Sequence, residues 1–340
     1  MEKILSVSVA AYNVESTLRE ALDPFAADPV RDLVEVWIVD DGSTDATRRI
    51  AADYEARYPD TFHLIAKENG GWGSTLNAAM QAATGRYFKQ LDGDDYFSHE
   101  NLADFLHFLS QTGADWVQSP YVTFEDGSGG IIRMLGSYEG GYRYFPLRKT
   151  IPIGECEALL PDMHSTTVRT ALLQQNHIRI LEHCFYTDVE FVLKSFNCCR
   201  TIAFYERPVY YYRLARSGQS MSLAGVRRHY RDHQKMLFEM LRYYQSEVKE
   251  PGQRAVIEKR LDGVCNMQYT FYYALACTPA QKRELIAFDR QLQQTAPDFY
   301  ARVEGRPLAL LRKTHFTGYK LVACCRMRKD RTLKRNLFAG

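Results

Sequence analysis

Apolar and polar positions follow two different periods along the first hundred residues. Three short apolar runs, at residues 4–10, 33–39 and 62–65, have the length and β-branched content of buried strands. Each run precedes apolar residues that recur every three or four positions, as on one face of a helix. A fourth strand is expected at residues 86–91. Strands that alternate with helices predict an α/β fold, with a mostly parallel sheet flanked by helices.

The pattern changes in the second half of the chain. A Gly-rich turn at residues 126–130 separates two short apolar runs and predicts a hairpin. From residue 226 onward the apolar positions have helical spacing, and residues 250–252 form a turn between two helices. We therefore expect a sheet domain at residues 1–225, made of parts 1–97 and 98–225, and a helical C-terminal region at 226–340.

Polar residues stand at the ends of three predicted strands. They are Tyr12-Asn13, Asp40-Asp41 and the acidic run Asp92-Gly93-Asp94-Asp95. Ligands of a parallel sheet bind beside the carboxyl ends of its strands, so we expect these residues to converge.

The acidic run predicts a metal site. Three crowded carboxylates repel one another and are tolerated mainly when a hard divalent cation lies among them. We expect Asp94 and Asp92 to hold Mn²⁺ or Mg²⁺, while Gly93 lets the backbone approach a ligand. The alternative is a solvated acidic turn, which is the usual fate of an isolated Asp-rich stretch.

Five segments, taken together, resemble a known family. Residues 4–220 resemble a family 2 glycosyltransferase of the GT-A fold, a nucleotide-sugar-dependent class that includes bacterial enzymes of surface-polysaccharide synthesis. Each motif alone is weak, but their shared order makes a coincidental match improbable. The matching segments are residues 7–13, 39–45, 69–77, 85–95 and 186–191.

The resemblance implies roles for particular residues. Asp92 would lie near the ribose and the metal, with Asp95 as a supporting carboxylate. Asp40 and Asp41 would read the base and ribose, and Tyr12 would pack against the base, although ordinary packing at the sheet edge is about as common for a lone aromatic. Further expected donor-site positions are Ala10, Gly71, Asn77 and Gly93, with His164, Arg213, Gln219 and Ser220 as weaker candidates.

Asp188 would be the general base of an inverting transfer, and Glu190 is the second choice. The family usually has an acid just before this Asp, where this chain has Thr187. An Asp in the first turn of a helix also favours the helix dipole without any catalytic role. The Arg usual before Asn77 is replaced by Leu76, so Lys67, Asn77 or a later basic residue would have to contact the diphosphate.

Charge is distributed unevenly along the chain. From residue 306 onward there are ten Lys or Arg and one acid, a net charge of +9, whereas the preceding residues carry −7. Such a tail suits an anionic membrane surface, nucleic acid or simple solvation, and nucleic acid is disfavoured because no nucleic-acid-binding module is recognisable. We expect peripheral membrane contact through the basic C-terminus.

The cysteines and apolar runs indicate a cytoplasmic protein. Eight cysteines show no CxxC spacing, and we expect them to stay reduced. No signal peptide is recognisable, and no apolar run approaches the roughly 18 residues that span a bilayer. We expect a cytoplasmic location, peripheral at the inner face of the membrane.

The expected function is metal-dependent, inverting transfer of a sugar from a UDP-sugar to a saccharide or lipid-linked acceptor. A nucleotidyltransferase is one alternative, but the loop after the first strand lacks the glycines and basic residues that hold a triphosphate. A catalytically silent nucleotide-sugar-binding protein is another, although binding alone needs no base such as Asp188. The Gly-rich turn at 70–73 lacks the dinucleotide spacing, which disfavours a dehydrogenase.

Overall fold

The computed structural model describes all residues except 1, 136–144, 158, 215–221, 304 and 330–340. The chain divides into two compact units, residues 1–214 with 251–253, and residues 215–250 with 254–340. The sequence placed a domain boundary at residue 225, and the assignment of a catalytic domain to 1–225 and a helical region to 226–340 stays a prediction.

The first unit contains the predicted α/β sheet. Its order is β3-β2-β1-β4-β10-β6-β11-β9, and β1 to β4 run parallel to one another. Strand β10 interrupts this pattern, because it pairs antiparallel with both β4 and β6. The strands are β1 (Leu5–Ala11), β2 (Val34–Asp40), β3 (Phe62–Ala66), β4 (Tyr87–Asp92), β6 (Trp116–Gln118), β9 (Thr150–Pro152), β10 (Thr166–Arg169) and β11 (Thr201–Phe204).

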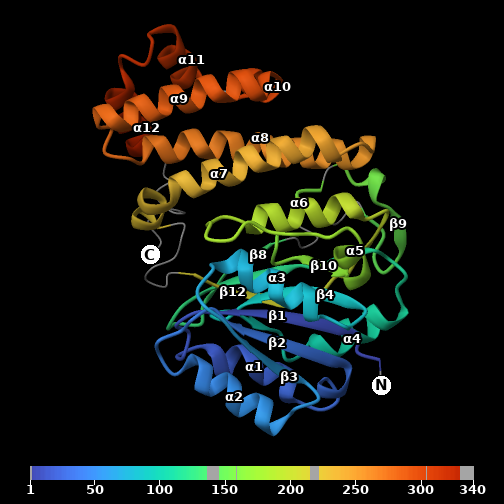
Figure 1. The fold of residues 1–340 in the computed structure, drawn as a ribbon. Helices are drawn as coiled ribbons and strands as arrows, with labels where there is room; N and C mark the ends of the chain where they lie inside the picture. Colours follow the sequence, from blue (N-terminus) through green and yellow to red (C-terminus); the bar gives the residue numbers. More distant parts are fainter. Residues whose placement is uncertain (1, 136–144, 158, 215–221, 304, 330–340) are drawn as a thin grey trace. The chain divides into compact units, whose positions relative to one another are not determined.

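Helices cover both faces of the parallel strands. In Figure 1, α1 (Leu18–Ala26) and α2 (Thr47–Arg57) lie on one face and α3 (Trp72–Ala82) lies on the other. Both side-chain rows of β1 are accordingly buried, including Ser6 and Ser8. The remaining helices of this unit are α4 (Leu102–Gln111), α5 (Thr170–Gln175), α6 (Asp188–Cys198) and the short 3₁₀ helices η1 (Arg31–Leu33) and η3 (Ile153–Glu155).

A second sheet of four strands lies in the same unit, in the order β5-β12-β7-β8. The predicted hairpin forms part of it, since β7 and β8 pair antiparallel on either side of the Gly-rich turn. The strands are β5 (Tyr96–Phe97), β7 (Tyr121–Glu125), β8 (Ile131–Leu135) and β12 (Tyr210–Leu214).

Glu35, a buried acid on β2, fastens the amino ends of the strands. Its carboxylate accepts hydrogen bonds from Ser6 Oγ at 2.6 Å, Thr84 Oγ1 at 2.6 Å and the Gly85 amide at 3.1 Å. Burial is the largest influence and raises the pKa of Glu35, but the hydrogen bonds together lower it below its ordinary value. These hydrogen bonds of Glu35 therefore join the strands at their amino ends, at the edge opposite their carboxyl ends.

The second unit is helical, as predicted. Along α7, the predicted apolar face of Tyr230, His233, Leu237, Met240, Leu241 and Tyr244 is buried. Burial lowers the pKa of His233 to about 4, and its Nδ1 lies 2.6 Å from Gln268 Oε1. The helices are α7 (Leu223–Glu247), α8 (Pro251–Tyr273), α9 (Pro279–Thr295), α10 (Pro297–Arg302), α11 (Arg306–Lys313) and α12 (Tyr319–Lys329). No described helix is both long and apolar enough to cross a membrane.

Candidate active site

The carboxyl ends of β1, β2 and β4 meet at one edge of the large sheet. Ala10 is opposite Asp92 in the register of β1 with β4, and Ala11 is opposite Asp40 in the register of β1 with β2. Tyr12 follows at the end of β1 with 52% of its surface exposed. The structure thus places Ala10, Tyr12, Asp40 and Asp92 at one edge, which is where ligands bind in such sheets.

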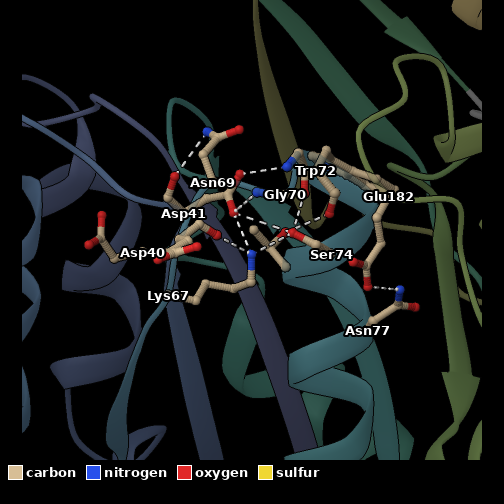
Figure 2. Close-up of polar contacts among 12 residues, drawn as sticks. Asp40, Asp41, Lys67, Asn69, Gly70, Trp72, Ser74, Asn77 and Glu182 are labelled. Atoms are coloured by element: carbon tan, nitrogen blue, oxygen red, sulfur yellow. Dashed lines mark hydrogen bonds and ion pairs between the residues drawn. The ribbon is translucent and has the colours of Figure 1, made fainter.

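Asp41 orders the Gly-rich turn that precedes α3. Its Oδ1 accepts hydrogen bonds from Lys67 Nζ at 2.8 Å and the Gly70 amide at 2.9 Å, and its Oδ2 accepts one from the Gly71 amide at 2.8 Å. Figure 2 shows Lys67 pointing into the same cluster, where Nζ also lies 2.9 Å from Ser74 Oγ. Lys67 and Asp41, which the sequence suggested as contacts of the donor, therefore already bond to each other.

Asp40, the residue before Asp41, is fully buried. Its Oδ2 accepts a hydrogen bond from Arg48 Nε at 2.7 Å, and its Oδ1 accepts one from the Ser43 amide at 3.1 Å. Asp40 consequently fastens the loop that follows β2 to the start of α2. Contact of Asp40 or Asp41 with a base or ribose stays a prediction.

Two glycines let the residues 180–184 pack closely on the Gly-rich turn. A Cβ on Gly73 would lie 2.1 Å from the Leu181 carbonyl oxygen, a distance that no side chain can occupy. Gly71 has a φ of 82°, in the left-handed region that favours glycine. The His183 amide donates to the Gly70 carbonyl at 2.5 Å, so the loop before α6 is bonded directly to the turn before α3.

Asn77 strengthens the same junction from α3. Its Nδ2 donates to the Ile180 carbonyl at 2.9 Å and to Glu182 Oε1 at 3.0 Å, and its Oδ1 accepts from the Ile180 amide at 2.9 Å (Figure 2). The side chain suggested as a diphosphate contact therefore has both of its ends bonded to the protein. Here Asn77 holds the segment that leads to Asp188.

The acidic turn after β4 contains the expected metal ligands. Asp92 Oδ1 accepts a hydrogen bond of 2.6 Å from Trp72 Nε1. Burial raises the pKa of Asp92 to about 6, and the nearby charge of Asp94 acts in the same direction. The Gly93 amide donates to the Ala10 carbonyl at 2.9 Å, and a Cβ on Gly93 would lie 2.9 Å from that oxygen. This turn is therefore held against the end of β1.

Asp95 and Arg213 hold the acidic turn in place through hydrogen bonds. Asp95 is buried and accepts hydrogen bonds from Tyr210 OH at 2.6 Å and the Arg213 amide at 2.7 Å. Burial, followed by the charges of the neighbouring acids, raises the pKa of Asp95 well above its ordinary value. The guanidinium of Arg213 donates to the Asp94 carbonyl at 2.7 Å and pairs with Glu20 and Asp126.

Arg213 is one of the weaker candidates for the donor site, and its contact with a donor stays a prediction. Its side chain is 8% exposed and is committed to three acceptors, so the structure gives it the task of supporting the acidic turn. Gln219 and Ser220, from the same predicted segment, lie outside the described residues.

Asp188 is the first residue of α6 and is partly exposed. Burial raises the pKa of the Tyr212 phenol, and so do the charges of nearby carboxylates. These carboxylates are Asp95, Asp92, Asp94 and Asp188, so Asp188 and the acidic turn lie near the same phenol. The carboxylates predicted for metal binding and for base catalysis thus act on one phenol.

Glu190, the second choice for the base, has a structural role. It is 1% exposed, its Oε1 lies 2.6 Å from Lys194 Nζ, and its Oε2 accepts from the Leu181 amide at 3.0 Å. A carboxylate paired with an ammonium is a weak proton acceptor, because the ion pair favours its charged form. The geometry therefore favours Asp188 over Glu190.

His164 lies among aromatic rings beside β12. Its ring centroid is 4.3 Å from that of Tyr212 and 4.8 Å from that of Tyr121, and its Nδ1 is 3.7 Å from Asp162 Oδ1. His164 therefore lies close to the Tyr212 phenol, whose pKa the four acids raise. It stays a candidate for the donor site without an assigned contact.

Sequence reasoning overlooked Trp72 and Lys89. Lys89 is fully buried on β4, donates to the His164 carbonyl at 2.8 Å and the Thr166 carbonyl at 3.1 Å, and has its pKa lowered to about 7 by burial. The available signal for Lys89 was a lysine in the middle of a predicted buried strand, and the signal for Trp72 was the lone aromatic residue of a Gly-rich turn.

The profile described as "Glycosyl transferase family 2" matches residues 6–165, which span β1 to the start of the β10 region. This chain contains a family 2 glycosyltransferase domain. The resemblance that the five motifs predicted is therefore confirmed.

Relatives of the domain include a poly(ribitol-phosphate) glycosyltransferase and a teichoic acid biosynthesis protein. Poly(ribitol-phosphate) beta-N-acetylglucosaminyltransferase TarS of Staphylococcus aureus is 28% identical over 226 residues, covering 65% of this chain and 37% of that protein. Minor teichoic acid biosynthesis protein GgaB of Bacillus subtilis is 26% identical over 238 residues, covering 68% and 25%. The chain spans only about a quarter to two fifths of the length of these relatives.

Solved structures confirm the GT-A fold. Residues 1–349 of S. aureus TarS, crystallised with UDP-GlcNAc, align with a TM-score of 0.69 and 22% identity, covering 96% of this chain and 92% of that one. A mannosyltransferase of Pyrobaculum calidifontis, in complex with GDP-Man and Mn²⁺, aligns with a TM-score of 0.54 and 17% identity, covering 97% and 88%.

Proposed function

We propose that this family 2 glycosyltransferase moves a sugar from a UDP-sugar to a hydroxyl of a cell-surface polymer or of its lipid-linked precursor. The observation that supports it most is the single edge at which the ends of β1, β2 and β4 meet, with Asp188 close enough to act on the same phenol as the acidic turn. The relatives whose names refer to teichoic acid polymers, and the TarS structure with UDP-GlcNAc, support the donor and acceptor classes.

A divalent cation fits the residues of the acidic turn. The raised pKa of Asp92 reflects burial beside a second carboxylate, Asp94, and a cation between them would offset that repulsion. Among the described residues no cluster of three or more His, Cys, Asp or Glu side chains forms, so the protein would supply few ligands and the diphosphate others. Bound Mn²⁺ or Mg²⁺ would stabilise the charge that develops on the leaving diphosphate.

The protein's own groups then have distinct tasks. Asp188 takes the proton from the acceptor hydroxyl as its oxygen attacks the anomeric carbon, while the bond from that carbon to the diphosphate breaks. A base on the face opposite the leaving group gives inversion at the anomeric carbon. Trp72 orients Asp92, and Arg213 and Tyr210 hold the acidic turn, so that the carboxylates are in position before the donor binds.

We further propose a cytoplasmic protein that touches the inner face of the membrane through its basic C-terminus. UDP-sugars are strongly hydrophilic, and a lipid-linked acceptor would bring the reaction to that surface. The alternatives are a nucleotidyltransferase and a nucleotide-sugar-binding protein without catalysis.

The decisive experiment measures UDP release from a panel of UDP-sugars with Mn²⁺, Mg²⁺ or EDTA, beside an Asp94→Asn variant. We expect metal-dependent release in the wild type and a loss of at least about tenfold, roughly 1.4 kcal/mol of barrier, in the variant. Donor binding without turnover would support the silent binding protein. Release of pyrophosphate from a nucleoside triphosphate and a sugar phosphate would support the nucleotidyltransferase.

A further inference from the structure

The second unit contains a polar cavity of about 380 Å³, formed by α9, α10 and the end of α11. Helix α9 contributes residues at positions 286, 289, 290 and 293, a spacing that places all four on one face. Its polar lining consists of Asp289, Arg290, Gln293, Tyr300, Arg312 and His315. This cavity belongs entirely to the second unit and shares no residue with the site described above.

Arg312 is held in a fixed orientation at the cavity. Its guanidinium carbon lies 3.7 Å from the centroid of the Tyr300 ring, and its Nε donates to Asp289 Oδ1 at 2.9 Å. Its Nη2 also donates to Tyr269 OH at 3.1 Å. Its Nη1 donates to the Tyr300 carbonyl at 3.4 Å. These contacts immobilise the group and use one N–H of each nitrogen, and a guanidinium has five N–H donors, so two remain for a ligand.

The lining carries excess positive charge. Asp289, its one acid, is 7% exposed and already accepts hydrogen bonds from Arg312 Nε and Tyr269 OH. Arg290 and His315 are exposed, and within the described part of the chain no acid pairs with Arg290. Two arginines against one acid give the lining a net charge of +1, which favours an anion, and arginine forks match phosphate oxygens well.

The size of the cavity limits what can enter. A volume of 380 Å³ is near the lower end of the roughly 300–1,000 Å³ typical of small-ligand sites. One phosphodiester with its neighbouring polyol would fit.

We propose that this cavity binds a phosphodiester unit of an anionic acceptor polymer, apart from the place where the sugar is transferred. The identity of the polymer rests on the proposed function, because phosphate-linked polyols are named for TarS. A second attachment point keeps a long acceptor bound between transfers, since rebinding of the tethered chain becomes intramolecular. The charge and geometry of the cavity stand independently of that activity.

The test is direct binding of a synthetic glycerol-phosphate hexamer to the full chain by calorimetry, with neither donor nor metal present. The variant is Arg290→Gln with His315→Gln, two exposed positions whose change leaves the Arg312–Asp289 pair intact. The matched control is Arg283→Gln, an exposed position on α9 outside the cavity. We expect the dissociation constant to rise at least tenfold in the double variant and less than twofold in the control.

Each outcome decides the question. Equal weakening in the control and the double variant would show general charge attraction and overturn the proposal, as would equal affinity for a neutral oligosaccharide of the same length. Inorganic phosphate that competes fully at micromolar concentration would identify a free-phosphate site, which also contradicts a polymer site. A selective loss of hexamer binding supports the cavity even if no sugar transfer is ever detected, so its result is separable from that of the proposed function.

Discussion

At the scale of single residues, the bond from Trp72 Nε1 to Asp92 is the contact whose removal is most informative. Trp72→Phe keeps an aromatic ring, although a smaller one, and loses the N–H donor, which lowers the pKa of Asp92 in the wild type. The pKa of Asp92 should therefore rise above its value of about 6. Activity that needs this carboxylate ionised should be lost at a higher pH, so the acid limb of the kcat/KM profile should move upward.

The control for this prediction is Trp116→Phe. It removes an indole hydrogen bond of 2.8 Å to Gln118 inside the core of the same unit. We expect it to lower the free energy of unfolding by about 1–3 kcal/mol or more without moving the acid limb, because Gln118 Oε1 loses its buried donor and the smaller ring leaves a cavity. An unchanged profile in Trp72→Phe would show that Trp72 does not position Asp92 for the reaction.

Asp188 and Glu190 should respond differently to loss of charge. If Asp188 is the base, Asp188→Asn should lower turnover by about 10² or more while donor affinity with metal stays near wild type. Glu190→Gln breaks the buried pair with Lys194 and should act mainly on the midpoint of urea unfolding. Turnover and donor affinity measured on both variants separate these outcomes. A product that retains the donor's anomeric configuration would contradict the inverting mechanism.

Sequence reasoning located the polar edge correctly but could not foresee which side chains the protein itself would use. Asn77 is bonded to Ile180 and Glu182, and Arg213 to Glu20, all of them distant in sequence. A motif shows that a polar residue stands near a strand end. It contains no information on the partner that arrives from another part of the chain.

At the scale of elements, Gly73 decides how closely the loop before α6 approaches α3. Gly73→Ala would place a methyl group 2.1 Å from the Leu181 carbonyl, and neither side is a flexible side chain. We expect the free energy of unfolding to fall by about 1–3 kcal/mol or more, as for other overpacked sites, with a matching loss of turnover. Chemical denaturation and UDP release measure the two effects.

Gly263→Ala is the matched control for that change. Gly263 lies within α8, and a Cβ there would meet nothing within 4 Å. This variant should gain about 0.5–1 kcal/mol, because alanine favours a helix interior over glycine by that amount. A Gly73→Ala protein as stable and active as wild type would mean that the loop can move away without cost.

The elements themselves were partly predictable. The four parallel strands begin and end within one residue or so of the apolar runs, because strands buried on both faces are rich in apolar residues. Strand β10 was not predicted, since Thr166–Arg169 is short and contains a single apolar residue. Its place between β4 and β6 depends on pairing rather than on its own composition.

At the scale of the whole molecule, the basic C-terminus predicts attraction to anionic membranes. Deletion of residues 326–340 removes six Lys or Arg and one Asp. Each basic residue near such a surface contributes about 1 kcal/mol of attraction, so co-sedimentation with phosphatidylglycerol vesicles at low salt should be lost. Deletion of 336–340 alone removes no charge and should leave co-sedimentation as in the full chain. Unchanged sedimentation after the longer deletion would rule out this membrane role.

The position of β10 also has a consequence for the way the protein is made on the ribosome. Synthesis of β4 is complete at Asp92, but β10, the strand that pairs with its outer edge, begins only at Thr166. At roughly 5–20 residues per second, that edge waits about 4–15 s for its partner. During this interval an open edge can pair with other nascent chains, and a charged residue on the strand opposes such pairing. Lys89 is that residue. It is a cation while the edge is open to water, and burial in the completed sheet lowers its pKa and favours its neutral form.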